Sequence, residues 1–187
     1  PPTRLCDGAA HQGVAAFAAA HEYAEMDDIF ALAESRNESP FIVVCDSLED
    51  PHNLGAILRS AEAAGVHGVI IPKRNSVTLN YTVAKTSAGA IEYVPVVKVA
   101  NLPAAIDELK SRGVWIFGAD MDGTDYTALD YSGSIALVIG SEGKGIGRLV
   151  REKCDFIASL PMRGKINSLN ASVAAGILMF EAAKHRN

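Results

Sequence analysis

Two segments rich in glycine and polar residues contain the side chains best suited to chemistry. The first reads G-S-E-G-K-G-I-G over residues 140–147 and carries one acid, Glu142, and one lysine, Lys144. It follows Ile135–Ile139, an apolar run that is typical of a buried strand. The glycines allow the backbone of this loop to approach a ligand closely. We therefore expect a ligand cleft here, at the carboxyl edge of a parallel sheet.

The second segment reads L-P-M-R-G-K-I-N-S-L-N over residues 160–170 and also begins at the end of an apolar strand. It leads into a helix that we predict over Ser168–Lys184, and either Asn167 or Ser168 could cap that helix. Ser168 and Asn170 could contact a ligand, or they could bond only to the amides of the first helical turn. Beside the glycine-rich loop, we favour contact with a ligand.

A third polar segment, residues 46–59, precedes and begins a helix that we predict over Leu54–Ala64. Asn53 is expected at its N-cap, and Arg59 is expected to point toward the strand ends because the apolar stripe faces elsewhere. A helix start beside an arginine and an asparagine favours an anion such as phosphate. A capped surface helix with a solvated Arg59 explains this segment equally well.

The glycine-rich loop matches neither of two common nucleotide-binding motifs. A Walker loop cannot be fitted because Lys144 follows Gly140 by only four positions. The dinucleotide fingerprint would need a glycine at position 148, where Arg148 stands. These mismatches disfavour a nucleotide-dependent or NAD-dependent enzyme on a doubly wound sheet.

Composition limits the class of protein. The chain has 187 residues, of which 49% are hydrophobic and 21% charged, as expected for one globular domain with its own core. Its net charge of −5 offers no overall basic field, so RNA would need a local patch. The three cysteines lack ligand spacing, so we expect reduced thiols, no metal site and a cytoplasmic location. No apolar run reaches the length of a membrane-spanning helix, and no signal peptide is visible.

Strands and helices alternate from residue 41 onward, which predicts an α/β fold with a mostly parallel sheet and helices on both faces. We assign residues 1–38 to an N-terminal linker or extension and residues 39–187 to the main domain. Strands are expected at Phe41–Cys45, Gly68–Ile71, Tyr93–Val99, Val114–Gly118, Ile135–Ile139 and Phe156–Leu160, and helices at Asp27–Ser35, Leu54–Ala64, Asn80–Ser87, Leu102–Ser111, Gly145–Glu152 and Ser168–Lys184.

Three of these segments together resemble the three motifs of the SpoU (TrmH-type) RNA ribose 2′-O-methyltransferases of the SPOUT superfamily, in family order. They are N-L-G-A-I-L-R at 53–59, I-G-S-E-G-K-G at 139–145 and P-M-R-G-K-I-N-S-L-N-A-S-V-A-A-G at 161–176. K-T-S-A-G-A-I-E at 85–92 and H-Q-G-V at 11–14 are also similar to that family. The resemblance spans about residues 40–184, with alanine at 171 where the family often has valine.

The resemblance implies a C-terminal deep trefoil knot, an exception to the rule that chains avoid knots. It also implies S-adenosylmethionine bound in the knot, and a homodimer with the site near the subunit interface. By motif, the residues that would hold the cofactor are Gly140, Ser141, Gly145, Leu160 and Leu169. The catalytic set would be Asn53, Arg59, Glu142, Ser168 and Asn170.

The implied chemistry suits these residue types. Methyl transfer from a sulfonium needs an aligned nucleophile, so positioning contributes much of the rate. Because a guanidinium has a pKa above 12, we favour Arg59 as the group that orients the 2′-hydroxyl and neutralises negative charge. Glu142 is expected to orient Arg59 or Asn53. Proton removal by a deprotonated Arg59 stays an alternative.

RNA binding would depend on a local cluster of cations beside the cleft loops. The candidates are Arg59, Lys144, Arg148, Arg163 and Lys165. Four other cations lie on or near these loops: Lys73, Arg74, Arg151 and Lys153. Of these four, we interpret Lys73 and Lys153 as solvated surface charges.

Within the family, the H-Q-G-V segment and the short C-terminus look most like the 23S rRNA guanosine 2′-O-methyltransferases. We therefore expect a guanosine of large-subunit rRNA as the target. The alternatives are a tRNA guanosine 2′-O-methyltransferase and a non-catalytic RNA-binding module on the same fold. Because the chain begins at Pro1, we also expect a small N-terminal RNA-binding domain to precede it. Without that domain, we expect cofactor binding but weak RNA methylation.

Overall fold

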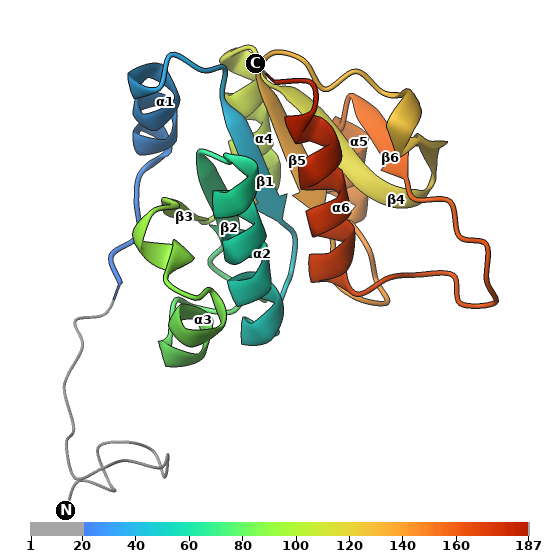
Figure 1. The fold of residues 1–187 in the computed structure, drawn as a ribbon, viewed down its shortest axis with the longest axis horizontal. Coiled ribbons are helices and arrows are strands. Elements are labelled where there is room, and N and C mark those ends of the chain that lie inside the picture. The colour runs from blue at the N-terminus through green and yellow to red at the C-terminus, as the bar shows by residue number, and fades with distance from the viewer. Residues whose placement is uncertain (1–20, 187) are drawn as a thin grey trace, which may run out of the picture.

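Six strands form one sheet in which all neighbouring strands are parallel (Figure 1). The computed structural model describes residues 21–186, so the H-Q-G-V segment at 11–14 lies outside the described residues. The strand order β3-β2-β1-β5-β4-β6 places β1 and β5 at the centre. The strands are β1 Phe41–Cys45, β2 Gly68–Pro72, β3 Val96–Val99, β4 Trp115–Asp125, β5 Ile135–Ile139 and β6 Phe156–Ser159.

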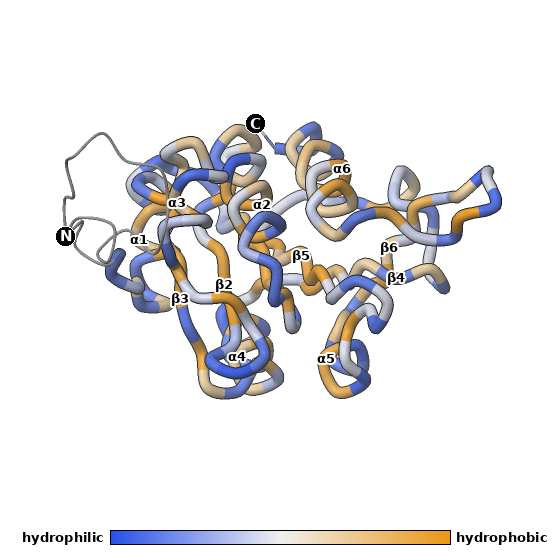
Figure 2. The backbone as a smooth tube through the Cα atoms, turned by 90° about the horizontal axis from the view of Figure 1, so that it is seen from below, coloured by the Kyte–Doolittle hydropathy of each residue, from blue (hydrophilic) through white to orange (hydrophobic). Residues whose placement is uncertain are grey.

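Helices cover both faces of the sheet. They are α1 Met26–Ser35, α2 Pro51–Ala64, α3 Tyr81–Thr86, α4 Leu102–Ser111, α5 Arg148–Lys153 and α6 Ala171–Ala183, with 3₁₀ turns η2 Ala90–Glu92 and η3 Tyr126–Ala128. Because successive strand residues point to opposite faces, Phe41 and Val43 of β1 pack with α2, α3 and α6, whereas Ile42 and Val44 pack with α1, α4 and α5. Figure 2 shows the strands between α2, α3 and α6 on one side and α4 and α5 on the other. The predicted α/β fold is confirmed.

Most helices begin at residues other than those predicted. α5 begins at Arg148 and not at the predicted Gly145, because the preceding residues belong to the glycine-rich turn, and α1 and α3 each differ by one residue. α2 begins at Pro51, and its N-cap is Asp50, whose side chain accepts a hydrogen bond from the His52 N–H at 2.8 Å. The prediction that Asn53 caps this helix was wrong, because proline suits the first helical position and the preceding aspartate already supplies the cap. α6 begins at Ala171 and is capped by Asn170, so the predicted start at Ser168 and the proposed caps at Asn167 and Ser168 were also wrong.

Two strands also differ in length from the prediction. β3 begins at Val96 because the preceding residues form η2 and a short turn. β4 continues to Asp125, well beyond the predicted end at Gly118, and pairs again with β6 after a register shift. The extension is polar and exposed, so it lacks the apolar run on which the prediction depended.

The N-terminal part of the described chain packs on the sheet. Ile29 of α1 is completely buried, and Ala24 forms a parallel bridge with Val97 of β3. Cys45 and Cys154 are free thiols, and burial raises the pKa of the Cys45 thiol to about 12. Among residues 21–186, no helix combines the length and the apolar character needed to cross a membrane.

Candidate active site

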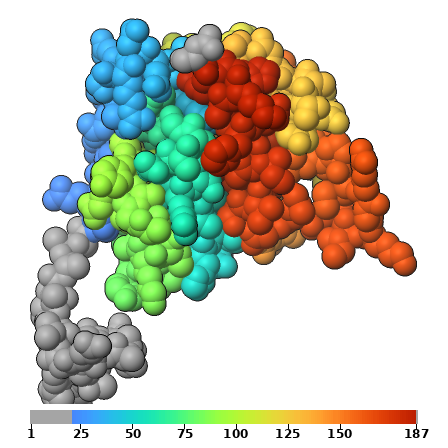
Figure 3. Space-filling view, in the orientation of Figure 1, coloured from blue at the N-terminus to red at the C-terminus, as the bar shows by residue number. Residues whose placement is uncertain are grey.

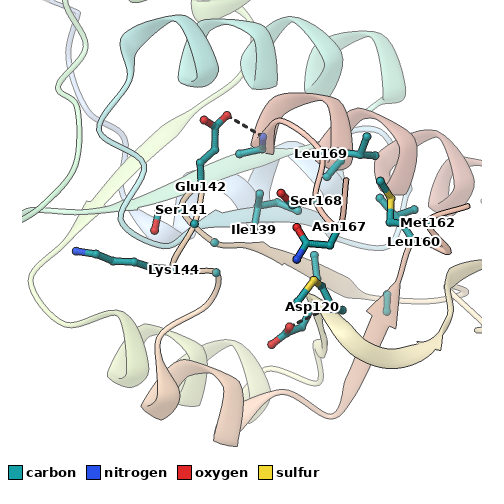
Figure 4. Close-up of a pocket in the computed structure, with 18 residues that line it drawn as sticks. Asp120, Ile139, Ser141, Glu142, Lys144, Leu160, Met162, Asn167, Ser168 and Leu169 are labelled. Carbon is teal, nitrogen blue, oxygen red and sulfur yellow. Dashed lines mark hydrogen bonds between the residues drawn. The ribbon is translucent and has the colours of Figure 1, made fainter. Parts of the chain in front are cut away.

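The loops that follow β5 and β6, together with part of β4 and the start of α6, surround a cavity of about 310 Å³ at the carboxyl edge of the sheet (Figure 4). One part of the wall is apolar and includes Ile139, Leu160 and Leu169. The other part is polar and comes from the glycine-rich loop and from Asn167 and Ser168. A cavity of this size with an apolar wall and a few polar groups suits a small organic ligand.

The glycine-rich loop is a closed turn. The Ser141 N–H donates to the Gly145 carbonyl oxygen at 3.2 Å, and the Gly145 N–H donates to the Ser141 carbonyl oxygen at 2.9 Å. A Cβ at Gly140 would lie 2.1 Å from the carbonyl carbon of Gly145, so no larger residue fits at this position without moving the backbone. Gly145 itself has φ +65°, which favours glycine. The loop therefore holds one shape at the cavity wall.

Asp46, directly after β1, binds the C-terminal end of this loop. Its carboxylate accepts a hydrogen bond from the Gly147 N–H at 2.7 Å and another from the Ser47 hydroxyl at 3.0 Å. Asp46 is only 8% exposed, so both contacts are shielded from water. Sequence reasoning missed Asp46, although its place directly after an apolar strand of a parallel sheet was a usable signal.

Three polar side chains from separate elements form a hydrogen-bonded cluster that we call the Glu142 cluster: Glu142, Asn53 and Asn170. The Oε1 atom of Glu142 accepts hydrogen bonds from the Asn53 Nδ2 at 3.3 Å and from the Asn170 Nδ2. The Asn170 Nδ2 also donates to the Asn53 Oδ1 at 3.0 Å. The Ala171 N–H donates to the same Oε1 at 3.2 Å, the contact dashed in Figure 4. One carboxylate thus joins the glycine-rich loop, α2 and the start of α6.

A second cavity of about 460 Å³ lies on the other side of the glycine-rich loop. It shares Ser141, Glu142, Lys144 and Gly145 with the first cavity. The rest of its wall is mainly polar and comes from the loops after β1 and β2, from α2 and from the end of the glycine-rich loop: Asp46, Ser47, Leu48, Glu49, Asp50, Asn53, Asn75 and Gly147. Glu142 therefore faces both an apolar-walled cavity and a polar one.

The structure brings most of the predicted site residues to these two cavities. Ser168 and Glu142 line the first cavity. All five residues predicted to hold the cofactor line it too: Gly140, Ser141, Gly145, Leu160 and Leu169. Lys144 lines both cavities. Asn53 lines the second cavity, and Asn170 joins the Glu142 cluster. The predicted contact of Glu142 with Asn53 is present.

Arg59 is not part of the Glu142 cluster of its own chain. It lies nearly two turns after Asn53 in α2, about 9 Å further along the helix axis, and its side chain is exposed. The predicted RNA-binding residues Arg163 and Lys165 are exposed in the loop between β6 and α6. Arg148 is also exposed and pairs with Glu152 at 3.5 Å.

Asp120 is a further cavity residue that sequence reasoning did not single out. It lies in the polar extension of β4, lines the first cavity (Figure 4), and accepts a hydrogen bond from the Arg151 Nε at 2.8 Å. Among residues 21–186, no cluster of histidine, cysteine, aspartate and glutamate has the arrangement of a metal site.

Residues 40–180 match the model of the SpoU rRNA Methylase family. YacO of Bacillus subtilis (strain 168), whose name assigns it to the TrmH family of tRNA/rRNA methyltransferases, is 57% identical over 178 residues. That alignment covers 95% of this chain and 72% of YacO. A relative in Staphylococcus aureus (strain MSSA476), whose name assigns it to the same family, is 54% identical, with 96% of this chain and 73% of the relative covered.

Solved structures of SpoU and TrmH proteins share the fold. The SpoU methyltransferase AviRb from Streptomyces viridochromogenes, in complex with the cofactor AdoMet, has a TM-score of 0.76 at 29% identity and covers 86% of this chain. The Aquifex aeolicus TrmH/SpoU tRNA modifying enzyme has a TM-score of 0.72 at 28% identity and covers 85% of this chain. This chain spans 61% of the AviRb chain and 82% of the Aquifex chain.

The first cavity fits S-adenosylmethionine, the cofactor of these methyltransferases. Its apolar wall at Leu160 and Leu169 suits an adenine ring, and the exposed backbone of the glycine-rich loop offers hydrogen-bonding groups close to the ligand. Gly140 leaves no room for a side chain, which keeps that backbone in place. The chain belongs to the SpoU rRNA Methylase family of RNA methyltransferases, which use S-adenosylmethionine and whose C-terminal trefoil knot this membership implies.

Proposed function

We propose that this protein transfers a methyl group from S-adenosylmethionine to the 2′-hydroxyl of a ribose in RNA. The observation that carries the proposal is the Glu142 cluster, which stands between an apolar-walled cavity and a polar cavity. Such a boundary suits a reaction that joins a small cofactor on one side to a polar nucleotide on the other. Residues 39–187 would then form the catalytic domain.

In this proposal, the first cavity positions the cofactor mainly through its shape. Leu160 and Leu169 contact the adenine, and the backbone of Gly140, Ser141 and Gly145 bonds to the polar groups. When bound, S-adenosylmethionine supplies an electrophilic methyl group on a sulfonium. The fixed turn of the glycine-rich loop lowers the entropy cost of aligning the reactants, which is a large part of the barrier.

The Glu142 cluster positions the ribose. Oε1 of Glu142 accepts all the hydrogen bonds described for this carboxylate. Oε2 is therefore left to accept a hydrogen bond from the substrate. Asn53 and Asn170 hold this carboxylate in one orientation, and Ser168 lies in the adjoining cavity wall. Preorganised polar groups of this kind stabilise developing charge without reorganising during the reaction.

We further propose that Arg59 acts across a homodimer interface. Val173, Ile177 and Phe180 of α6 are exposed apolar residues, with 36–50% of each accessible to solvent. α2 and α6 lie side by side on this surface (Figure 3), where Gly176 approaches the Ser60 hydroxyl. A second copy that covers this face would lie beside Arg59. The guanidinium would then orient the 2′-hydroxyl and neutralise an RNA phosphate in the partner's site.

The proposed substrate is a guanosine of large-subunit rRNA, modified in the cytoplasm, where the ribosomal subunits mature. Membership of the SpoU rRNA Methylase family supports rRNA. The likeness to an Aquifex aeolicus tRNA modifying enzyme supports tRNA as the second candidate. Both candidates use the same site, so only the RNA decides between them.

The test supplies the chain with S-adenosylmethionine labelled with tritium in its methyl group, and with unmodified transcripts of large-subunit rRNA and of tRNA. We expect label in rRNA, at a ribose that becomes resistant to alkaline cleavage. Label in tRNA alone would replace the rRNA proposal, and label in neither would contradict methyl transfer to these RNAs. Calorimetry should show binding of S-adenosylmethionine but no binding of NAD.

A further inference from the structure

The connection from β2 to α3, together with α3 itself, carries positive charges and no negative charge beside the site. Residues 73–91 include Lys73, Arg74 and Lys85 and no aspartate or glutamate, in a chain whose net charge is −5. All three cations are exposed, and none pairs with a carboxylate among residues 21–186. An unpaired local excess of positive charge on an acidic protein suits a polyanion.

Several cations elsewhere on the surface are paired with carboxylates instead. Arg112 lies 2.7 Å from an Asp27 oxygen, and Lys153 lies 2.6 Å from an Asp107 oxygen. Lys184 pairs with Glu181 in the same way. Their charges are largely cancelled by these carboxylates, whereas those of the β2–α3 connection remain available to a ligand.

This connection adjoins the polar cavity of the site. Asn75, directly after Arg74, lines the cavity together with Asn53 and Glu142. The Val77 N–H donates to the Leu48 carbonyl oxygen at 3.0 Å, which ties the connection to the loop after β1. In Figure 1, α3 lies beside the first turns of α2, at the end of the molecule where the site is found.

Tyr81 adds an aromatic ring to this charged surface. It is 75% exposed, the highest value among the large hydrophobic side chains of the described chain. Packing in the core therefore does not explain an aromatic residue at this position. Lys85 follows it by one helical turn, so both side chains lie on the same face of α3. Exposed aromatic rings beside cations are the usual means of holding unpaired bases and their phosphates.

α3 is held rigidly in this position. A Cβ at Gly55 of α2 would lie 1.8 Å from the Thr86 Oγ1, so the two helices touch at a point where only glycine fits. Asn80 caps α3 by accepting a hydrogen bond from the Val83 N–H at 3.0 Å. The Tyr23 hydroxyl accepts another from the Leu79 N–H at 3.0 Å. Tyr81 and Lys85 are therefore presented at a fixed distance from the Glu142 cluster.

We propose that Lys73, Arg74, Tyr81 and Lys85, which we call the β2–α3 surface, bind the single-stranded RNA that flanks the target nucleotide. The three cations contact phosphates, and Tyr81 stacks on an unpaired base. This inference rests on the proposed function and goes beyond it, because it assigns a strand-binding surface outside the three motifs of the family. It also replaces the interpretation of Lys73 as a merely solvated charge.

The experiment measures binding of the 187-residue chain to a fluorescein-labelled, single-stranded RNA of mixed sequence at several salt concentrations. The test variant is Lys73→Gln, Arg74→Gln, Lys85→Gln. Each lost phosphate contact on a single strand lowers the slope of log K against log[salt] by about 0.7, so we expect a slope smaller by about 2. The matched control, Arg36→Gln, Arg112→Gln, Lys184→Gln, removes the same charge and should keep the wild-type slope.

Two further variants test the stacking. Tyr81→Ala should weaken RNA binding about tenfold, whereas Tyr81→Phe keeps the ring and should bind as the wild type does. With the rRNA transcript, the triple variant should raise KM while kcat and the affinity for S-adenosylmethionine stay unchanged. If the wild-type protein methylates RNA but the test and control variants have equal slopes, this inference alone is overturned. A wild-type protein that neither binds nor methylates RNA would contradict the proposed function as well.

Discussion

At the residue scale, one oxygen atom organises the site. Oε1 of Glu142 accepts hydrogen bonds from two asparagine side chains and from the Ala171 N–H. Asn170 has a second task, because its Oδ1 accepts from the Ser172 and Val173 N–H groups and caps α6. Substitution can separate these two roles, since the cap needs an oxygen and the carboxylate needs an N–H donor.

We predict that Asn170→Asp keeps the helix cap but impairs methyl transfer. Aspartate caps helices as well as asparagine does, so the free energy of unfolding should change little. The variant loses the amide donor to Glu142 and places a second carboxylate beside it, so kcat/KM should fall at least about tenfold. Asn170→Ala is the control, and it should also lose about 1 kcal/mol of stability. Wild-type activity in Asn170→Asp would show that the donor does not matter.

Asp46 offers a second test at this scale. Asp46→Ala leaves the Gly147 N–H without its partner in a shielded position, which costs ~1–3 kcal/mol. We expect weaker binding of S-adenosylmethionine by calorimetry, because the glycine-rich loop is no longer fastened to β1. Ser47→Ala removes only the neighbouring hydroxyl and should bind the cofactor normally. If both variants bind equally well, Asp46 does not position the loop.

At the element scale, the contact of α2 with α3 depends on Gly55. We predict that Gly55→Ala destabilises the protein by about 1–3 kcal/mol, since the added methyl would overlap the Thr86 side chain. The double variant Gly55→Ala, Thr86→Ala removes the hydroxyl and should recover part of the loss. Urea unfolding of the two single variants and the double variant measures this coupling. Additive effects would mean that the two helices do not meet here.

His67 links β1 to the loop before β2 and gives stability a pH dependence. Its Nδ1 accepts a hydrogen bond from the Phe41 N–H at 2.9 Å, and its Nε2 lies 2.9 Å from a Glu38 oxygen. Burial lowers the pKa of His67 below its ordinary value of 6.5, although Glu38 acts in the opposite direction. Between the two pKa values, the unfolded chain binds a proton that the folded chain does not.

It follows that the stability due to neutral His67 is complete above pH 6.5 and decreases as the pH falls from 6.5 through the lower folded-state pKa. We expect the free energy of unfolding, measured in urea, to decline over this range. His67→Gln should be less stable at pH 7.5, and the difference from the wild type should shrink as the pH falls. A constant difference would contradict a lowered pKa.

The elements show why sequence reasoning found the fold but missed some boundaries. The apolar runs of β1 and β5 are unambiguous because both faces of these strands are buried. The start of α2 was missed because Asp50 and Pro51 precede the apolar period of the helix. The end of β4 was missed because its polar extension is held by pairing with β6, a contact between residues distant in sequence.

At the scale of the whole molecule, the position of Arg59 leads to a test of the proposed dimer. If Arg59 serves the partner's site, a chain with Arg59→Ala and a chain with Asn170→Ala should complement each other. In the mixed dimer, one intact Glu142 cluster would receive the intact Arg59 of the partner subunit. We expect such heterodimers, purified through two different tags, to transfer methyl groups although each parent homodimer does not. Inactive heterodimers would place Arg59 in the site of its own chain.

The site as a whole could be predicted only in part. The residue types and their loops identified the members of the Glu142 cluster and the cavity lining. Lys73 and Arg74 were among the cations named from the sequence, but Asp120 and the placement of Tyr81 and Lys85 beside those cations could not be found in this way. They depend on the packing of β4 on β6 and of α3 on α2.

The contact of the Ala171 N–H with Glu142 has a consequence for the newly made protein. α6 is synthesised after every other described element, and its first residues supply two of the partners of that carboxylate. A nascent chain whose residues 170 and 171 are still inside the ribosome therefore has an incomplete Glu142 cluster. If the proposed function holds, methyl transfer can begin only after α6 has been synthesised and has packed against the glycine-rich loop.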